Sequence, residues 1–127
     1  MHLKFKDLVE ICLKLRAKGG CPWDQEQTIE SLKACVLEEA QEVAEAIESG
    51  KAEDIQEEIG DLLFTLVMMT NIAAEDKKFD MKDVLEGAAE KLVRRHTWVF
   101  GTDKAETAEE ALELWMKNKE KEKKANK

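Results

Sequence analysis

Two acidic clusters on either side of a short polar break constrain the fold of this chain more than any other feature. Between Leu37 and Asp61 the sequence reads LEEAQEVAEAIESGKAEDIQEEIGD. Each cluster holds an acidic pair three residues apart, Glu39 with Glu42 and Glu58 with Asp61. Residues at this spacing share one face of a helix. Two helices that fold back on each other at the Ser-Gly-Lys break would therefore bring four carboxylates together.

Carboxylates this close repel one another unless a cation lies between them. Mg²⁺ is the usual candidate, because it takes oxygen ligands. The alternative is a solvated, glutamate-rich face balanced by lysines. On helical wheels the four residues border the apolar arcs instead of lying opposite them, and a short turn between consecutive helices favours an antiparallel hairpin. Both observations favour a metal site, but spacing alone leaves the two interpretations open.

The composition is that of an ordinary helical protein. The chain has 127 residues, is 43% hydrophobic and 38% charged, and contains one proline and six glycines. This length is typical of one domain. The net charge of −8 argues against non-specific nucleic-acid binding, which needs a basic surface. We therefore expect a single all-α domain over residues 1–127 that does not bind nucleic acid.

Cysteine usage and hydropathy indicate where such a chain resides. Cys12, Cys21 and Cys35 are odd in number and form no CxxC pair, so neither a zinc site nor a disulfide framework is supported. The N-terminus lacks an apolar signal core. The longest uncharged run, residues 62–74, is too short and too polar to span a bilayer. We expect a soluble cytoplasmic protein with no membrane partner.

Periodicity and capping signals predict a bundle of about five helices. The expected ranges are 3–18, 28–49, 52–76 and 80–96, followed by a helix that begins at the capping box Thr107-x-x-Glu110. Residues 21–27 are expected to form a loop that carries Trp23, after which Asp24 or Thr28 would cap the second helix. The lysine-rich residues 117–127 are expected to be a frayed helix end or a disordered tail.

The third helix predicts a partner subunit. After Asp61 it carries no charge for thirteen residues and is apolar on several sides, and a helix that is apolar all round is buried all round. A small bundle can hardly bury one helix completely, so we expect a homodimer that completes the core; pairing of dimers into a tetramer stays open. The predicted apolar arc of this helix comprises Ile55, Ile59, Leu62, Leu66, Met69 and Ala73.

The fourth helix carries cations on its predicted core face. Arg95 falls inside that face and Lys91 lies on its margin; the apolar members of the face are Met81, Val84, Leu85, Ala88 and Leu92. Cations at such positions need an anionic partner.

Four motifs together resemble a known family. They are CPWD at 21–24 with Gln27-Thr28, LEEAxEV at 37–43, EEIGDLL at 57–63, and EKLxRRH followed by VFG at 90–101. In this order they resemble the MazG-like nucleoside triphosphate pyrophosphohydrolases over about residues 3–120. The chain departs from the family in having one such domain where some members have two, and in having His96-Thr97-Trp98 where His-Pro is commoner.

This resemblance implies an all-α, Mg²⁺-dependent enzyme that converts NTP and water to NMP and diphosphate, in a role such as nucleotide-pool cleansing. The family motif ExxE–ExxD maps onto Glu39, Glu42, Glu58 and Asp61 as catalytic metal ligands. Glu38, or one of those four in a second role, would take the proton from the attacking water. The residues implied near substrate are Lys91 and Arg95 for phosphates, Trp23 for the base or ribose, and Trp115 with Lys119.

Two alternatives remain beside this interpretation. One is a related pyrophosphohydrolase with another nucleotide substrate, against which the CPWD and RRH-x-x-VFG motifs argue. The other is a non-catalytic helical dimer that binds nucleotides or partner helices. Turnover distinguishes them, because a binder would release no pyrophosphate. The spacing of residues in the sequence does not predict which base or sugar the protein prefers.

Overall fold

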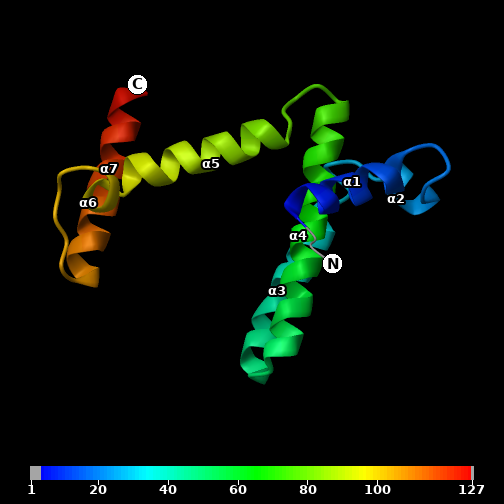
Figure 1. Ribbon diagram of the computed structural model, residues 1–127, viewed down its shortest axis with the longest axis horizontal. Coiled ribbons are helices and arrows are strands. Elements are labelled where there is room, and N and C mark those ends of the chain that lie inside the picture. Colours follow the sequence, from blue (N-terminus) through cyan, green and yellow to red (C-terminus); the bar gives the residue numbers. More distant parts are fainter. Residues whose placement is uncertain (1–3, 127) are drawn as a thin grey trace. The chain divides into compact units, whose positions relative to one another are not determined.

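The computed structural model of this protein describes residues 4–126. All regular secondary structure in this range is helical, which confirms the all-α class. The chain forms two compact units, one up to Met81 and one from Lys82 onward, and each is described by itself. The single domain expected over residues 1–127 stays a prediction. Figure 1 labels the seven helices of the described range: α1 Phe5–Arg16, α2 Pro22–Glu26, α3 Lys33–Ser49, α4 Ala52–Glu75, α5 Met81–Arg95, α6 Thr97–Phe100 and α7 Ala108–Ala125.

The hairpin of α3 and α4 is the main element of the first unit. The two helices lie side by side and are joined by a two-residue turn (Figure 1). Gly50 ends α3 with a φ of 74°, a left-handed conformation that glycine adopts without steric cost. The expected antiparallel hairpin is thereby confirmed, and α4 agrees with the predicted range 52–76 to one residue.

A small apolar core holds α1 against this hairpin. Its fully buried members come from α1, from α4 and from the segment just before α3: Cys12, Leu32, Val67, Met68 and Ile72. Burial raises the pKa of the Cys12 thiol to about 11, with a further contribution from the charge of Asp24. The core is therefore tightly closed around Cys12, which stays a neutral, apolar packing group.

The buried face of α4 differs from the predicted apolar arc. Ile59 and Leu66 belong to that arc, yet they are 52% and 42% exposed, whereas Thr65 and Thr70 are buried. The physical reason is that each threonine hydroxyl donates to the carbonyl one turn earlier, at 3.1 Å and 2.9 Å respectively. A hydroxyl satisfied by its own helix can enter the core at little cost. The rest of the predicted arc is not exposed: Ala73 is fully buried, and Ile55, Leu62 and Met69 are partly buried.

The segment expected as a loop at residues 21–27 contains the short helix α2. Pro22 is its first residue, a position where the missing N–H has no partner to lose. Arg16 holds this segment in place through hydrogen bonds. Its Nη1 donates to the carbonyl oxygens of Asp24 at 2.6 Å and of Gln27 at 2.8 Å, while Nε and Nη2 donate to the Glu75 carboxylate at 2.7 and 2.8 Å. One guanidinium thus ties α1, α2 and the end of α4 together.

The predicted start of the second long helix at Thr28 is wrong, because α3 begins at Lys33. Thr28 and Ser31 instead bond each other's backbone. The Thr28 N–H donates to the Ser31 hydroxyl at 2.8 Å, and the Ser31 N–H donates to the Thr28 hydroxyl at 3.0 Å. Such side-chain bonds compete with helical ones, so residues 28–32 form turns and neither Asp24 nor Thr28 caps α3.

In the second unit, α6 and α7 pack together after α5. The capping box is confirmed at its threonine, since the Thr107 hydroxyl accepts from the Glu110 N–H at 3.2 Å. Residues 117–125, expected to be frayed or disordered, continue α7 as helix. Asn118 is buried there and donates to the Arg95 carbonyl at 2.9 Å and to the Thr97 hydroxyl at 3.1 Å. This bond pattern explains why the helix persists.

Most of the predicted core face of α5 is exposed: Val84, Leu85 and Leu92 are 41%, 51% and 50% exposed, and α5 contributes no fully buried residue. Its first member, Met81, is partly buried against the core of the first unit. Periodicity identified the helix, which agrees with the range 80–96 to one residue at each end. The start of the first helix at Leu3 falls outside the described residues. Between residues 4 and 126, no helix has both the length and the apolar character to cross a membrane.

Candidate metal centre

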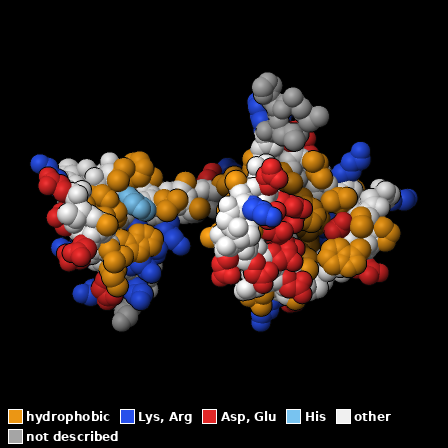
Figure 2. Space-filling view, turned by 90° about the horizontal axis from the view of Figure 1, so that it is seen from below, with side chains coloured by type: hydrophobic (Ala, Val, Ile, Leu, Met, Phe, Trp, Pro, Cys, Tyr) orange, Lys and Arg blue, Asp and Glu red, His pale blue; other side chains and the backbone are white. Residues whose placement is uncertain are grey.

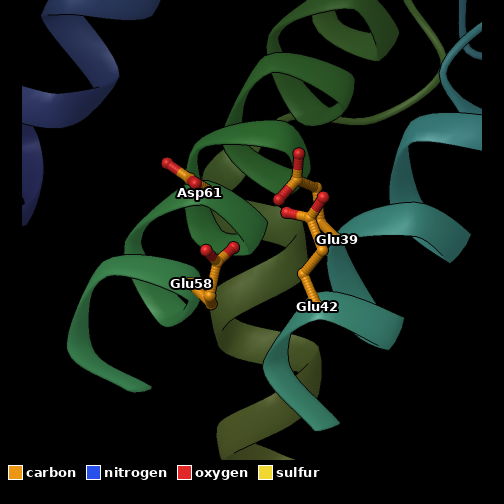
Figure 3. Close-up of side chains that lie close together, drawn as sticks. All are labelled: Glu39, Glu42, Glu58 and Asp61. Carbon is orange, nitrogen blue, oxygen red and sulfur yellow. The ribbon is translucent and has the colours of Figure 1, made fainter. Parts of the chain in front are cut away.

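The four carboxylates predicted from the acidic clusters converge between α3 and α4. Glu39 and Glu42 project from α3, and Glu58 and Asp61 project from α4 (Figure 3). One oxygen from each side chain lies within 4.8 Å of those of the other three. The spacing of three residues on each helix, combined with the Gly50 turn, explains the convergence. Figure 2 shows the acidic side chains gathered over this part of the first unit.

Two of these oxygens have no partner. Within the described residues, Oε2 of Glu39 and Oε2 of Glu58 are buried and form no hydrogen bond. Buried polar atoms are nearly always paired, and an unpaired buried anion is especially costly. An exposed glutamate-rich face would leave all its oxygens to solvent, so these two atoms favour a bound cation over the solvated alternative.

The electrostatics of the cluster agree with this interpretation. Burial raises the pKa of Glu39, and the nearby carboxyl groups of Glu42, Asp61 and Glu38 raise it further. A hydrogen bond with Glu42, together with burial and the surrounding negative charges, raises the pKa of Glu58 to about 7. Without a cation the cluster therefore retains protons near neutral pH, and a cation would displace them.

The donor set fits a hard divalent ion. All four side chains offer carboxylate oxygen and none offers nitrogen or sulfur, a combination that suits Mg²⁺, Ca²⁺ or Mn²⁺. The fifth predicted carboxylate, Glu38, lies outside this cluster and is exposed. It acts on the site through its charge, as the pKa of Glu39 shows.

A cavity of about 310 Å³ is shared by two of the predicted metal ligands and Trp23. Its lining includes Glu39 and Asp61 as well as Trp23, which is 55% exposed. The remaining lining residues were not predicted as site residues: Asp24, Leu32, Cys35, Phe64, Thr65 and Met68. The structure therefore brings the predicted aromatic residue and two predicted metal ligands to one pocket. The sequence marked Asp24 as the last residue of the CPWD motif and as a candidate helix cap, but not as a site residue.

The second unit brings together three of its four predicted site residues. The Arg95 guanidinium carbon lies 5.1 Å from the centroid of the Trp115 ring, and the Lys119 ammonium lies 5.7 Å from it, both within cation–π range. Lys91 is exposed. Arg95 also donates from Nε and Nη2 to Glu122 at 3.0 and 2.9 Å.

Glu122 is the anion that the core-facing Arg95 required, and sequence reasoning missed it. It also accepts from Arg94 Nε at 2.6 Å. Hydrogen bonds from Arg95 and Arg94 lower the pKa of the Glu122 carboxyl to about 2. A requirement for an anion was evident from the sequence, but several glutamates of α7 were eligible.

Comparisons with known proteins agree with the resemblance. The family model for the MazG nucleotide pyrophosphohydrolase domain matches residues 27–100. The nucleoside triphosphate pyrophosphohydrolase/pyrophosphatase MazG of Thermotoga maritima is 45% identical over 97 residues, which are 76% of this chain and 38% of that protein. The nucleoside triphosphate pyrophosphohydrolase of Escherichia coli K12 is 40% identical over 109 residues, 85% of this chain and 41% of that protein.

A solved structure shows the same arrangement. The crystal structure of a MazG-related protein from Thermotoga maritima superposes with a TM-score of 0.75 at 31% identity, covering 91% of this chain and 98% of that chain. The chain spans about two fifths of the length of the two curated relatives described above. The matched domain, the identity to these relatives and the shared fold establish that the chain belongs to the MazG nucleotide pyrophosphohydrolase domain family.

Proposed function

We propose that this protein is a Mg²⁺-dependent nucleoside triphosphate pyrophosphohydrolase, which converts NTP and water to NMP and diphosphate. The observation that supports this most is the cluster of four carboxylates with two orphaned buried oxygens, beside a cavity that reaches Trp23. The two relatives described above are named nucleoside triphosphate pyrophosphohydrolases, which agrees with this proposal. A cytoplasmic location and a role in nucleotide-pool cleansing are part of the proposal.

Glu39, Glu42, Glu58 and Asp61 would hold the metal. When bound, Mg²⁺ neutralises triphosphate charge and lowers the pKa of the attacking water. In the reaction, the water oxygen bonds to the α-phosphorus while the bond from that phosphorus to the bridging oxygen breaks. The electron pair of the broken bond leaves with diphosphate.

The proton of the attacking water needs an acceptor. Glu38 is a candidate, because it is exposed and its charge reaches Glu39. A ligand carboxylate in a second role is the other candidate. Glu58 fits that role, since one of its oxygens is orphaned. A base must lie within hydrogen-bond reach of the water.

Each unit, taken by itself, carries residues that the resemblance implies near substrate. Trp23 offers an exposed indole face in the cavity for the base or ribose. Lys91 and Arg95 would bind phosphates, with Trp115 and Lys119 near substrate. Arg95 uses Nε and Nη2 for Glu122, so phosphate would approach Nη1 or replace Glu122.

The apolar surface of the first unit supports a homodimer, which can pair again into a tetramer. An open groove of about 380 Å³ is lined by Ile29, Val36, Leu37, Leu66 and Met69 together with two charged residues, Glu30 and Lys33. Ile59 and Leu66, on the predicted apolar arc of α4, are exposed in the single chain. Exposed apolar area of this kind marks an interaction surface. A sedimentation mass of one chain at micromolar concentration would contradict the dimer.

The test of activity is pyrophosphate release from a panel of NTPs and dNTPs, with and without Mg²⁺. Metal-dependent release with NMP as the second product is the expected result. If nucleotides raise the melting temperature without any release, the protein is a nucleotide-binding helical dimer instead. Release from one specialised nucleotide alone would favour the related pyrophosphohydrolase.

A further inference from the structure

Asp24 is a largely buried acidic residue whose side chain has no bonding partner in the described part of the chain. The residue is 7% exposed. Within residues 4–126, its side chain takes part in no hydrogen bond and no ion pair. Arg16 attracts it only through space, since the guanidinium bonds the Asp24 carbonyl oxygen and the Glu75 carboxylate instead. Neither Asp24 oxygen is among the fully buried unpaired atoms of the described residues, which are Glu39 Oε2 and Glu58 Oε2. The Asp24 carboxylate therefore keeps some accessible surface and is open to a hydrogen-bond donor.

The carboxylate lies where a nucleoside would be bound under the proposed function. Asp24 lines the same cavity as the metal ligands Glu39 and Asp61, and its neighbour Trp23 lines it too. The apolar part of the lining consists of Leu32, Phe64 and Met68. An aromatic face with apolar walls suits a flat ring.

The polar groups of this cavity are nearly all acceptors. The Thr65 hydroxyl donates its hydrogen to the Asp61 carbonyl oxygen at 3.1 Å, so toward a ligand it can only accept a hydrogen bond. Cys35 is at most a weak donor, and the indole N–H of Trp23 is the strong side-chain donor among the described lining residues. No lysine, arginine, asparagine or glutamine is among the described residues that line the cavity. A complementary ligand must therefore bring donors of its own.

We propose that Asp24 selects nucleobases that carry an exocyclic amino group, by accepting its N–H. This inference rests on the proposed function. Cytosine, adenine and guanine have such a group, while uracil, thymine and hypoxanthine present a carbonyl or a hydrogen there. A carbonyl oxygen facing a buried carboxylate leaves both acceptors unpaired, which is costly.

Hydrogen bonds fix the position of the segment that carries Asp24, as discrimination between nucleobases requires. Arg16 Nη1 donates to the carbonyl oxygen of Asp24 at 2.6 Å and to the carbonyl oxygen of Gln27 at 2.8 Å. The Gln25 side chain adds a bond to the Ala17 carbonyl at 2.7 Å. Specificity depends on such fixed placement of a polar group.

The experiment compares kcat/KM for two substrate pairs that differ at the amino group, CTP with UTP and GTP with ITP. We expect at least one pair to show a preference of about tenfold or more for the amino-bearing base, consistent with one charged hydrogen bond. Preferences below about twofold in both pairs overturn the proposal. A comparison of GTP with dGTP tests the sugar. If kcat/KM depends on the sugar and not on the base, Asp24 contacts the ribose and the proposal is overturned as well.

Asp24→Asn tests the residue itself, with Glu26→Gln on the same helix as the matched control, because Glu26 is exposed and does not line the cavity. We expect Asp24→Asn to lose most of the preference and Glu26→Gln to keep it. A folded Asp24→Asn protein with the full preference overturns the proposal. If that variant fails to fold, Asp24→Ser replaces it. Absence of release from every nucleotide in the wild type is different: it rejects the proposed function.

Discussion

The two units differ in whether their clustered charges have partners of opposite sign. In the first, four carboxylates of α3 and α4 lie together, and two of their buried oxygens have no partner among the described residues. In the second, the cations of α5 meet a carboxylate of the same chain, because Glu122 pairs with both Arg94 and Arg95. Uncompensated buried charge identifies a place built for a ligand, whereas compensated charge is also explained by folding alone. The predictions below test this distinction, from the largest expected effect to the smallest.

Glu42→Gln should nearly abolish activity while leaving the fold intact. The amide removes one predicted metal ligand and one negative charge from the cluster, and activity depends on the metal under the proposed mechanism. We expect Mg²⁺-dependent pyrophosphate release to fall by about a hundredfold or more. Without metal, the variant should melt at an equal or higher temperature than the wild type, because a like-charge repulsion is relieved.

The matched control is Glu48→Gln, an exposed glutamate later on the same helix and outside the cluster. It should retain wild-type turnover. Full activity in Glu42→Gln would contradict the assignment of this cluster as the metal centre.

The metal-free protein should lose stability as the pH rises from about 4.5 to about 7. The folded-state pKa of Glu58 is raised from 4.5 to about 7 by its hydrogen bond with Glu42, by burial and by nearby charges. In this window the folded protein therefore binds a proton that the unfolded chain has released, and stability falls with rising pH. Thermal melts in a chelator across this range measure the slope.

Glu58→Gln should flatten that slope, and saturating Mg²⁺ should flatten it in the wild type, because the cation replaces the protons. Glu122 does not interfere in this window. Its pKa is lowered to about 2, so the stability that it contributes is lost only as the pH falls toward that value. A melting temperature that rises from pH 4.5 to 7 in chelator would contradict the description of the cluster.

Arg16→Ala tests a compensated charge in the first unit. It removes the donor to the carbonyls of Asp24 and Gln27 and the partner of Glu75. We expect the free energy of unfolding to fall by about 1–3 kcal/mol, since part-buried carbonyls are left unpaired. Because Trp23 and Asp24 lose their anchor, KM should rise more than kcat falls.

Arg16→Lys is the control, since it keeps the charge but loses the planar fork, and it should give an intermediate result. Urea unfolding and steady-state kinetics measure the two effects. An unchanged KM in a destabilised Arg16→Ala protein would mean that the anchor serves folding only.

Local features were predictable from the sequence, and features set by tertiary contacts were not. The convergence of Glu39 with Asp61 follows from helical spacing and from Gly50, which act within a few residues. The buried face of α4 does not, because a wheel counts Thr65 as polar although its hydroxyl is satisfied by Asp61. Likewise, the partner of Arg95 lies 27 residues away at Glu122, and periodicity carries no information about such a pair.

Glu122→Gln is expected to have the smallest effect. It decides whether Arg95 binds phosphate or serves folding alone. The amide removes the negative charge from Arg94 and Arg95 but preserves the shape of the contact. If Arg95 binds phosphate, KM for the triphosphate should fall severalfold, since the substrate no longer competes with a carboxylate, and kcat should change little. Glu120→Gln on the same helix, an exposed position, should leave KM unaltered. An unchanged KM in Glu122→Gln, together with a lower melting temperature, would assign the Arg95–Glu122 pair to folding alone and would leave phosphate binding to other cations.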